Sequence, residues 1–319
     1  MKIETNVLDI GARYGLHPSW KKLVNSEFKF FLFEPEPNEA KRLKKKYKGI
    51  KNIKIVDKAL GDSNKKITLN VTKHTALSSI FLRKNNNPLL QNATSREVQK
   101  KVIVNMMTLA NFCNKFRLSP HFIKLDTEGT ELMILENAKM NLTKTLAIRS
   151  EVSFEKIFNH TKEGDFCKLH NFLISNDFIL LNLDYDGKGF KMSEQISDSS
   201  KFGFLQTTDA VWIKNPKKMN VYYNDSKSIL RISLFCFFNN APDVAIFFLL
   251  KNAQKYNHFQ NLKNTETYKI LVKSLAKHFY NIRWSPNQKF KEHKKIFKLT
   301  LGLDLPEYNQ YNESLFYNP

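Results

Sequence analysis

The chain has 319 residues, of which 42% are hydrophobic and 13% aromatic, which is enough apolar material for a folded core. The net charge is +21, but only eight of the 51 basic residues are arginine, so we expect attraction to anionic partners without specific nucleic-acid recognition. Polar positions interrupt the longest apolar run, residues 229–250, and the three cysteines lack metal-ligand spacing, so no membrane span, disulfide framework or structural zinc is expected.

The N-terminal part of the chain alternates between short apolar runs and amphipathic segments. This order of strand, helix, strand, helix, strand is typical of half of a doubly wound α/β sheet. No signal peptide precedes the first strand, so a cytoplasmic location is expected. The predicted strands are residues 5–10, 28–33 and 53–56, and the predicted helices are residues 16–26 and 39–48.

The pattern continues to Lys214 and then changes to purely helical periodicity. We therefore predict a seven-stranded α/β domain at residues 1–214 and an all-α extension at residues 215–319. The remaining strands of the sheet are residues 121–125, 145–151, 178–183 and 209–213, with helices at 109–116, 131–140 and 165–175. Residues 66–71 and 101–106 alternate like exposed strands, and the extension contains predicted helices at 226–238, 242–256, 266–282 and 287–301.

The pattern Asp9-x-Gly11-x-x-x-Gly15 lies at the first strand-to-helix turn. Glycines at such a turn let the backbone pass close to a ligand, although a plain tight turn is the alternative. The chain lacks the GxGxxG and GxxxxGK[ST] patterns of dinucleotide and phosphate sites. Glu34 ends the second strand, where a carboxylate can accept both hydroxyls of a ribose, and Ala59-Leu60 can form an apolar floor under an adenine.

Three acidic residues follow the strand at 121–125, in the run Asp126-Thr127-Glu128-Gly129-Thr130-Glu131. Ligands of open α/β sheets bind at this carboxyl edge, so Asp126 and Glu128 are candidates for a general base or for divalent-cation ligands. Glu131 is expected to be structural because it lies inside the following helix. Glu151 ends the neighbouring strand and is a candidate for the acceptor site. His17 and His74 are other possible bases, and residues 75–92 form a candidate lid over the acceptor.

Taken in order, these motifs resemble FkbM-type methyltransferases. The resemblance covers residues 5–214, and its most specific element is the run Lys124-x-Asp126-x-Glu128-Gly129-x-Glu131. It implies a class I methyltransferase (Rossmann-like) fold with S-adenosyl-L-methionine as methyl donor. The motifs that carry it are Asp9–Gly15, Phe33-Glu34-Pro35, Ala59-Leu60-Gly61-Asp62, the Lys124–Glu131 run, Ser150-Glu151-Val152 and Thr208–Ile213.

The resemblance also implies where the cofactor binds and what is methylated. Arg13 stands where the family often has asparagine, and it either replaces a contact near the cofactor's methionine end or clashes there. Acceptors in this family are mostly hydroxyl groups of sugars, glycolipids or natural products. The expected cofactor-binding residues are Asp9, Gly11, Arg13, Gly15, Glu34, Ala59 and Leu60, and the expected catalytic residues are Asp126, Glu128 and Glu151.

Two other functions fit the sequence. A methyltransferase-like domain without catalysis would act as a binding scaffold. A nucleic-acid methyltransferase would explain the positive charge, but the acidic run at Asp126–Glu128 replaces the Asp/Asn-Pro-Pro-aromatic motif of base methylation. The expected partners are a sugar or glycan acceptor, with glycan-assembly enzymes or an anionic membrane surface as further possibilities.

Overall fold

The computed structural model describes residues 3–83, 97–160, 164–184, 188–190, 204–251, 262–279 and 298. Its contacts divide the chain into two compact units, Glu4–Tyr222 and Met1–Ile3 with Tyr223–Pro319. The sequence places this boundary after Lys214. The segment that follows stays with the first unit, because Lys218 and the hydroxyl of Tyr222 both hydrogen-bond the Asp177 carboxylate at 2.5 Å.

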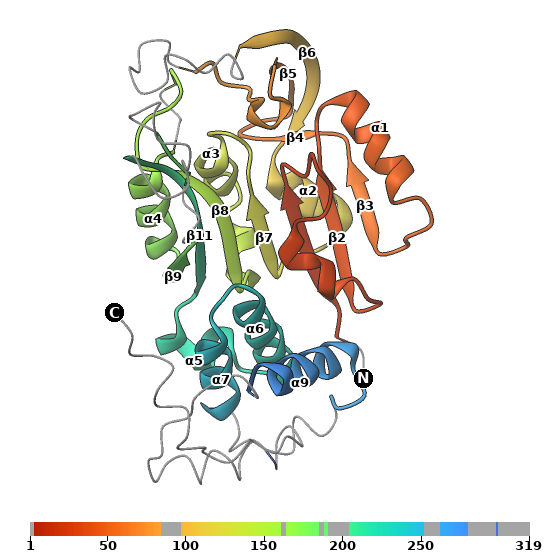
Figure 1. Ribbon diagram of the computed structural model, residues 1–319, viewed down its shortest axis with the longest axis vertical. Helices are drawn as coiled ribbons and strands as arrows, with labels where there is room; N and C mark the ends of the chain where they lie inside the picture. Colours follow the sequence, from red (N-terminus) through yellow and green to blue (C-terminus); the bar gives the residue numbers. More distant parts are fainter. Residues whose placement is uncertain are drawn as a thin grey trace, which may run out of the picture. The chain divides into compact units, whose positions relative to one another are not determined.

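A mixed eight-stranded sheet forms the centre of the first unit (Figure 1). Five parallel strands run in the order β3-β2-β1-β7-β8, and β8 then pairs with the antiparallel β11, which also pairs with β9. These seven strands confirm the expected class I arrangement, and the short β10 adds an eighth. Their bounds are β1 Thr5–Ile10, β2 Phe28–Phe33, β3 Ile53–Val56, β7 Phe122–Leu125, β8 Ala147–Ser153, β9 Phe178–Leu183, β10 Lys188–Phe190 and β11 Phe204–Lys214.

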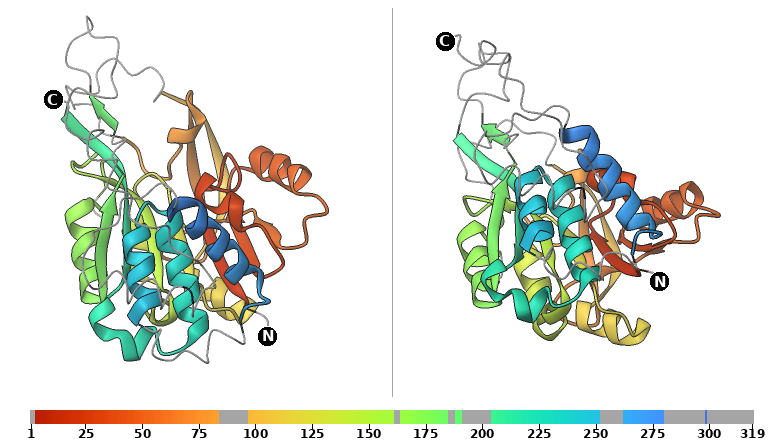
Figure 2. Two further views of the ribbon diagram at one scale, coloured as in Figure 1. Left: turned by 60° about the horizontal axis from the view of Figure 1, so that its bottom comes forward. Right: turned by 90° about the horizontal axis from the view of Figure 1, so that it is seen from below.

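Helices of this unit cover the sheet, and α1, α2 and α4 are amphipathic. Apolar side chains of β1, β7 and β8 form one core cluster with Phe112 of α2, Ile134 of α3 and Leu169 of α4. The turned views in Figure 2 place α1 beside β3 and α4 beside β9, at opposite edges of the sheet. The helices are α1 Pro37–Lys46, α2 Leu109–Phe116, α3 Glu131–Glu136, α4 Phe166–Ser175 and α5 Met219–Tyr222.

Two helix predictions were wrong in extent. The predicted helix 16–26 is a short 3-10 helix, η1 (Pro18–Leu23), whose threefold spacing buries both Trp20 and Leu23. The predicted helix 131–140 ends at Glu136, where the side chain of Asn137 donates a hydrogen bond to the Met133 carbonyl oxygen at 2.9 Å. Such side-chain competition favours a helix end, and a second 3-10 helix, η5 (Lys139–Lys144), follows.

A second, three-stranded sheet was not predicted as a separate element. It has the order β4-β6-β5, with β4 at Ala59–Leu60, β5 at Lys65–Thr72 and β6 at Val98–Met107. The two exposed strands of the sequence analysis are β5 and β6, which pair as an antiparallel ribbon around their own apolar cluster. A short 3-10 helix, η2 (Thr75–Leu77), follows β5.

The second unit is helical in its described residues. The helices are α6 Ser226–Phe238, α7 Pro242–Lys251 and α9 Glu266–Phe279, and α6 packs against both others. Asp225 caps α6 by accepting a hydrogen bond from the Ser228 amide at 2.9 Å. Apart from residue 298, the predicted helix 287–301 lies outside the described residues. None of the described helices combines the length and apolar character that crossing a membrane requires.

Candidate active site

The turn after β1 needs glycine for a steric reason. Gly11 has a φ of +82°, and a Cβ there would lie 1.7 Å from the carbonyl oxygen of Asp126, which follows β7. Gly15 has a φ of +96°, and its Cβ would lie 2.4 Å from the hydroxyl of Tyr47. That hydroxyl accepts a hydrogen bond from the Leu16 amide at 2.9 Å. The glycine motif therefore brings the chain close to β7 and α1, leaving room beside the turn.

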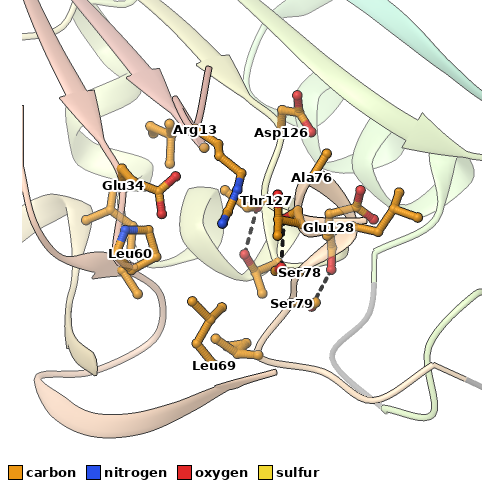
Figure 3. A pocket seen from close by; sticks show the side chains of 18 of the residues that line it. Arg13, Glu34, Leu60, Leu69, Ala76, Ser78, Ser79, Asp126, Thr127 and Glu128 are labelled. Carbon is orange, nitrogen blue, oxygen red and sulfur yellow. Dashed lines mark hydrogen bonds between the residues drawn. The ribbon is translucent and has the colours of Figure 1, made fainter. Parts of the chain in front are cut away.

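A cavity of about 320 Å³ opens at the carboxyl edge of the sheet, between the ends of β1, β2 and β7 and the second sheet. Figure 3 shows Arg13 between Glu34 on one side and Asp126 and Thr127 on the other. Eight of the ten predicted site residues line it: Gly11, Arg13, Glu34, Ala59, Leu60, Asp126, Glu128 and Glu151. Asp9 and Gly15 do not line it, so their contribution is to the shape of the turn.

Asp9 is fully buried beneath this turn, and its Oδ2 accepts the amide of His17 at 2.9 Å. The ammonium group of Lys124, on β7, lies 3.8 Å from Asp9 Oδ1 and 3.0 Å from Asp126 Oδ2. Burial alone would lower the pKa of Lys124, but the two carboxylates outweigh it and hold the pKa above its usual value. Lys124 therefore stays charged and joins the turn to the acidic edge of the cavity.

Glu34 lines the cavity with its carboxylate, at the position where the sequence predicts a ribose contact. Its side chain is almost completely buried, and burial raises its pKa to about 7 against the opposing effects of the Glu36 amide and the Arg13 guanidinium. The Glu36 amide donates a hydrogen bond to Glu34 Oε1 at 2.8 Å, which fixes the direction of the carboxylate. Ala59, Leu60 and Leu69 supply an apolar wall on the side of the second sheet, the kind of surface that an adenine ring requires.

Three carboxylates meet at the other end of the cavity. Oxygens of Asp126, Glu128 and Glu151 all lie within 4.8 Å of one another. Glu128 forms an ion pair with Arg83 at 2.6 Å, and the guanidinium lies over the Phe158 ring at 4.8 Å. This end of the cavity is acidic, which suits the positive sulfonium of S-adenosylmethionine.

The loop between β7 and α3 holds these acids in place. Glu131 accepts hydrogen bonds from the amides of Thr127 and Gly129 at 2.7 and 2.9 Å, so it organises the loop backbone. Glu128 has a φ of +58°, a left-handed conformation that costs energy for a residue with a side chain. The hydroxyl of Ser79 donates a hydrogen bond to the Glu128 carbonyl oxygen at 2.6 Å and stabilises that conformation.

The two histidines considered as bases differ in position. His74 lines the cavity but is exposed. His17 does not line it, and burial, together with Lys124 and Arg149, lowers its pKa to about 4. Of the predicted lid at 75–92, residues 75–80 line the cavity, and residues 84–92 lie outside the described part of the chain.

The sequence reasoning missed the roles of two residues: it gave Arg83 no pairing, and it placed Ser79 only in the candidate lid, without its contact to Glu128. Both lie between β5 and β6, far along the chain from Glu128, so no local motif links them. The rarity of arginine could have drawn attention to Arg83, because arginine occupies only eight positions in a chain rich in lysine. An arginine retained in such a composition often has a pairing role that lysine fills poorly.

Comparison with known proteins identifies the family. The family model of the methyltransferase FkbM domain matches residues 9–191, more than half of the chain. The chain belongs to the FkbM methyltransferase domain family. It is thus a methyltransferase of the S-adenosylmethionine-dependent class, and the glycine turn, Glu34 and the apolar wall fit that cofactor.

The solved structures that match this chain have low sequence identity to it and low TM-scores. The FkbM methyltransferase of Methylobacillus flagellatus KT is 14% identical with a TM-score of 0.38, and the match covers 67% of this chain and 44% of that one. This chain therefore spans less than half the length of that relative. Fibrillarin of Methanococcus jannaschii is 15% identical (TM-score 0.36, 67% and 68% covered), and precorrin-6y C5,15-methyltransferase of Geobacter metallireducens GS-15 is 10% identical (TM-score 0.33, 67% and 83% covered). The comparison with curated proteins finds no match.

Glu34 should make cofactor binding depend on pH. With a pKa of about 7, its ionised fraction rises from roughly one tenth at pH 6 to nine tenths at pH 8. Ribose hydroxyls donate to the carboxylate form, so the affinity for S-adenosylhomocysteine should rise up to about tenfold over that range. By calorimetry, Glu34→Gln should bind S-adenosylhomocysteine more weakly, and its affinity should not rise between pH 6 and pH 8. Glu136→Gln, at an exposed position, should show the same rise in affinity as the unmodified protein. An equal slope in Glu34→Gln contradicts the assignment.

Replacing Gly11 should remove the cofactor site. In Gly11→Ala the new methyl group meets the Asp126 backbone, so the turn or β7 must move, and we expect affinity for S-adenosylhomocysteine to fall by about 100-fold. Gly49→Ala is the matched control, because Gly49 also has a positive φ, +87°, but a Cβ there meets nothing within 4 Å. Gly49→Ala should lower the melting temperature slightly and leave affinity unchanged, and equal losses in both variants would reject the steric argument.

Proposed function

We propose that this FkbM protein transfers a methyl group to a hydroxyl of a sugar, glycan or glycolipid. The observation that carries the proposal is a second hollow, of about 130 Å³, which meets the cofactor cavity. Leu77, Glu128 and Glu151 line both, so the two spaces meet at the acidic cluster. A methyl group at that junction is within reach of an acceptor in the second hollow.

The lining of the second hollow suits a sugar ring. One part is apolar, with Val152, Ile157 and Phe158, and another is polar, with Gln206 and Thr207. A pyranose has the same division, since its C–H faces are apolar and its edge carries hydroxyls. The volume is about 0.4 of that of the cofactor cavity, which favours one ring over an extended chain of sugars.

The acidic cluster contains a suitable proton acceptor. When bound, S-adenosylmethionine supplies the methyl group on an activated sulfonium. The acceptor oxygen forms a bond to that methyl carbon as the bond from sulfur breaks, and the hydroxyl proton must go to a base. We assign that role to Asp126, whose side chain is 41% exposed and oriented by Lys124. Glu128 is held in place by its ion pair with Arg83. Glu128 and Glu151 lie beside Asp126, where they would accept hydrogen bonds from the acceptor and orient its hydroxyl.

Asp126→Asn should abolish turnover and spare cofactor binding. The amide cannot take a proton, so we expect a loss of about 100-fold or more in transfer of labelled methyl to a panel of simple glycans. The affinity for S-adenosylhomocysteine should change less than about threefold, because the shape of the side chain is retained.

Glu136→Gln is the control, since Glu136 is exposed and lines neither hollow. Unchanged turnover in Asp126→Asn removes that residue from the mechanism. Cofactor binding by the unmodified protein without transfer to any glycan contradicts the proposed acceptor class and favours a binding scaffold.

A divalent cation held by Asp126, Glu128 and Glu151 is the rival arrangement. Two of these carboxylates already have a cation within 3.0 Å, Lys124 and Arg83, which lowers the attraction for a metal ion. We therefore expect turnover to stay within about twofold after treatment with EDTA, and added Mg²⁺ to have no effect. Loss of turnover that Mg²⁺ restores would instead assign the three acids as metal ligands.

A further inference from the structure

The ribbon of β5 and β6 has one apolar and one exposed face. Cross-strand pairs alternate between the two faces, because successive side chains of a strand point in opposite directions. Ile67 with Val104 and Leu69 with Val102 lie in the apolar cluster under the ribbon. The opposite face carries Lys66 with Asn105 and Thr68 with Ile103. Further along, Asn70 opposite Lys101 is buried, because its side chain donates a hydrogen bond to the Ser79 carbonyl oxygen at 3.1 Å. Ile103 is 62% exposed, an unusual position for a large aliphatic side chain.

This outer face continues into a groove of about 510 Å³ at the base of the ribbon. Four lysines line the groove, Lys58, Lys65, Lys66 and Lys115, together with three asparagines. Among the residues that the structure describes, no carboxylate lines it. Asp62 reaches Lys65 at 3.2 Å and offsets one of the four charges. The groove is shallow and wide open, and it gathers positive charge that attracts anions.

The composition of the groove favours phosphate groups without bases attached. Lysine binds phosphate as a point charge, and asparagine amides can donate hydrogen bonds to its oxygens. Its described lining contains neither an arginine nor an aromatic ring, the residues that read bases and stack on them in nucleic-acid sites. An exposed isoleucine beside lysines suits the boundary between lipid headgroups and acyl chains.

We propose that the groove and the outer face of the ribbon bind the headgroups of anionic phospholipids. Lys65, Lys66 and Lys115 contact the phosphates, and Ile103 enters the interfacial layer. Lys58 lines both the groove and the cofactor cavity, so the lipid surface would lie beside the active site. This placement suits an acceptor that is itself anchored in a membrane, although docking does not depend on methyl transfer.

Sedimentation of the full chain with vesicles tests the proposal. The protein should bind vesicles of equal parts phosphatidylglycerol and phosphatidylcholine at physiological ionic strength, and not vesicles of phosphatidylcholine alone. Each lysine near an anionic surface contributes about fivefold, so Lys65→Gln/Lys66→Gln/Lys115→Gln should weaken partitioning by about 100-fold. Ile103→Gln should weaken it several-fold.

The matched control is Lys41→Gln/Lys51→Gln/Lys144→Gln, which removes the same net charge at exposed lysines outside the groove. It should keep vesicle binding within about threefold. Equal losses in both triple variants would show that only net charge matters and would overturn the proposal. Binding of inorganic pyrophosphate or of RNA through the groove, without vesicle binding, would also overturn it. Affinity for S-adenosylhomocysteine reports folding of each variant and separates this result from the proposed methyl transfer.

Discussion

The site depends on one buried ammonium group between two carboxylates. Lys124 lies 3.0 Å from Asp126, which directly follows the same strand, and 3.8 Å from Asp9, which belongs to the distant strand β1. Without Lys124, the buried Asp9 carboxylate would face the negative charge of Asp126 with no opposing charge beside it, which raises the free energy of its ionised form. With it, the glycine turn and the acidic loop keep a fixed spacing. The same pairing gives the proposed base its orientation, so one interaction serves both the fold and the chemistry.

Much of the fold follows from patterns that are local in the sequence. The central strands β1 and β7 are buried on both faces, so they read as short apolar runs, and the glycine turn marks the end of β1. Glu34 and the acids after β7 were predictable because the carboxyl ends of parallel strands share one edge. Helix extents were less predictable. Asn137 ends α3 through its own side chain, and the threefold spacing of Trp20 and Leu23 looks helical in the sequence.

The remaining site residues depend on contacts between distant segments. Arg83 reaches Glu128 only because β5 and β6 form a sheet of their own at the cavity edge, and nothing in the local sequence indicates that arrangement. The non-lining position of Asp9 has a similar origin. Its place in the motif Asp9-x-Gly11 predicts that Asp9 contacts the ligand. In the folded protein, its carboxylate instead points to the His17 amide and to Lys124.

The left-handed backbone of Glu128 has an evolutionary consequence. A glycine at this position would relax the backbone by about 1 kcal/mol, but removing one partner of a largely buried ion pair costs about 3 kcal/mol or more, so the backbone strain alone does not favour glycine. Glycine would also leave Arg83 without its carboxylate and remove one acid from the junction of the two hollows. Among homologues, glycine at this position is therefore expected only together with replacement of Arg83, in members that no longer keep the acidic cluster.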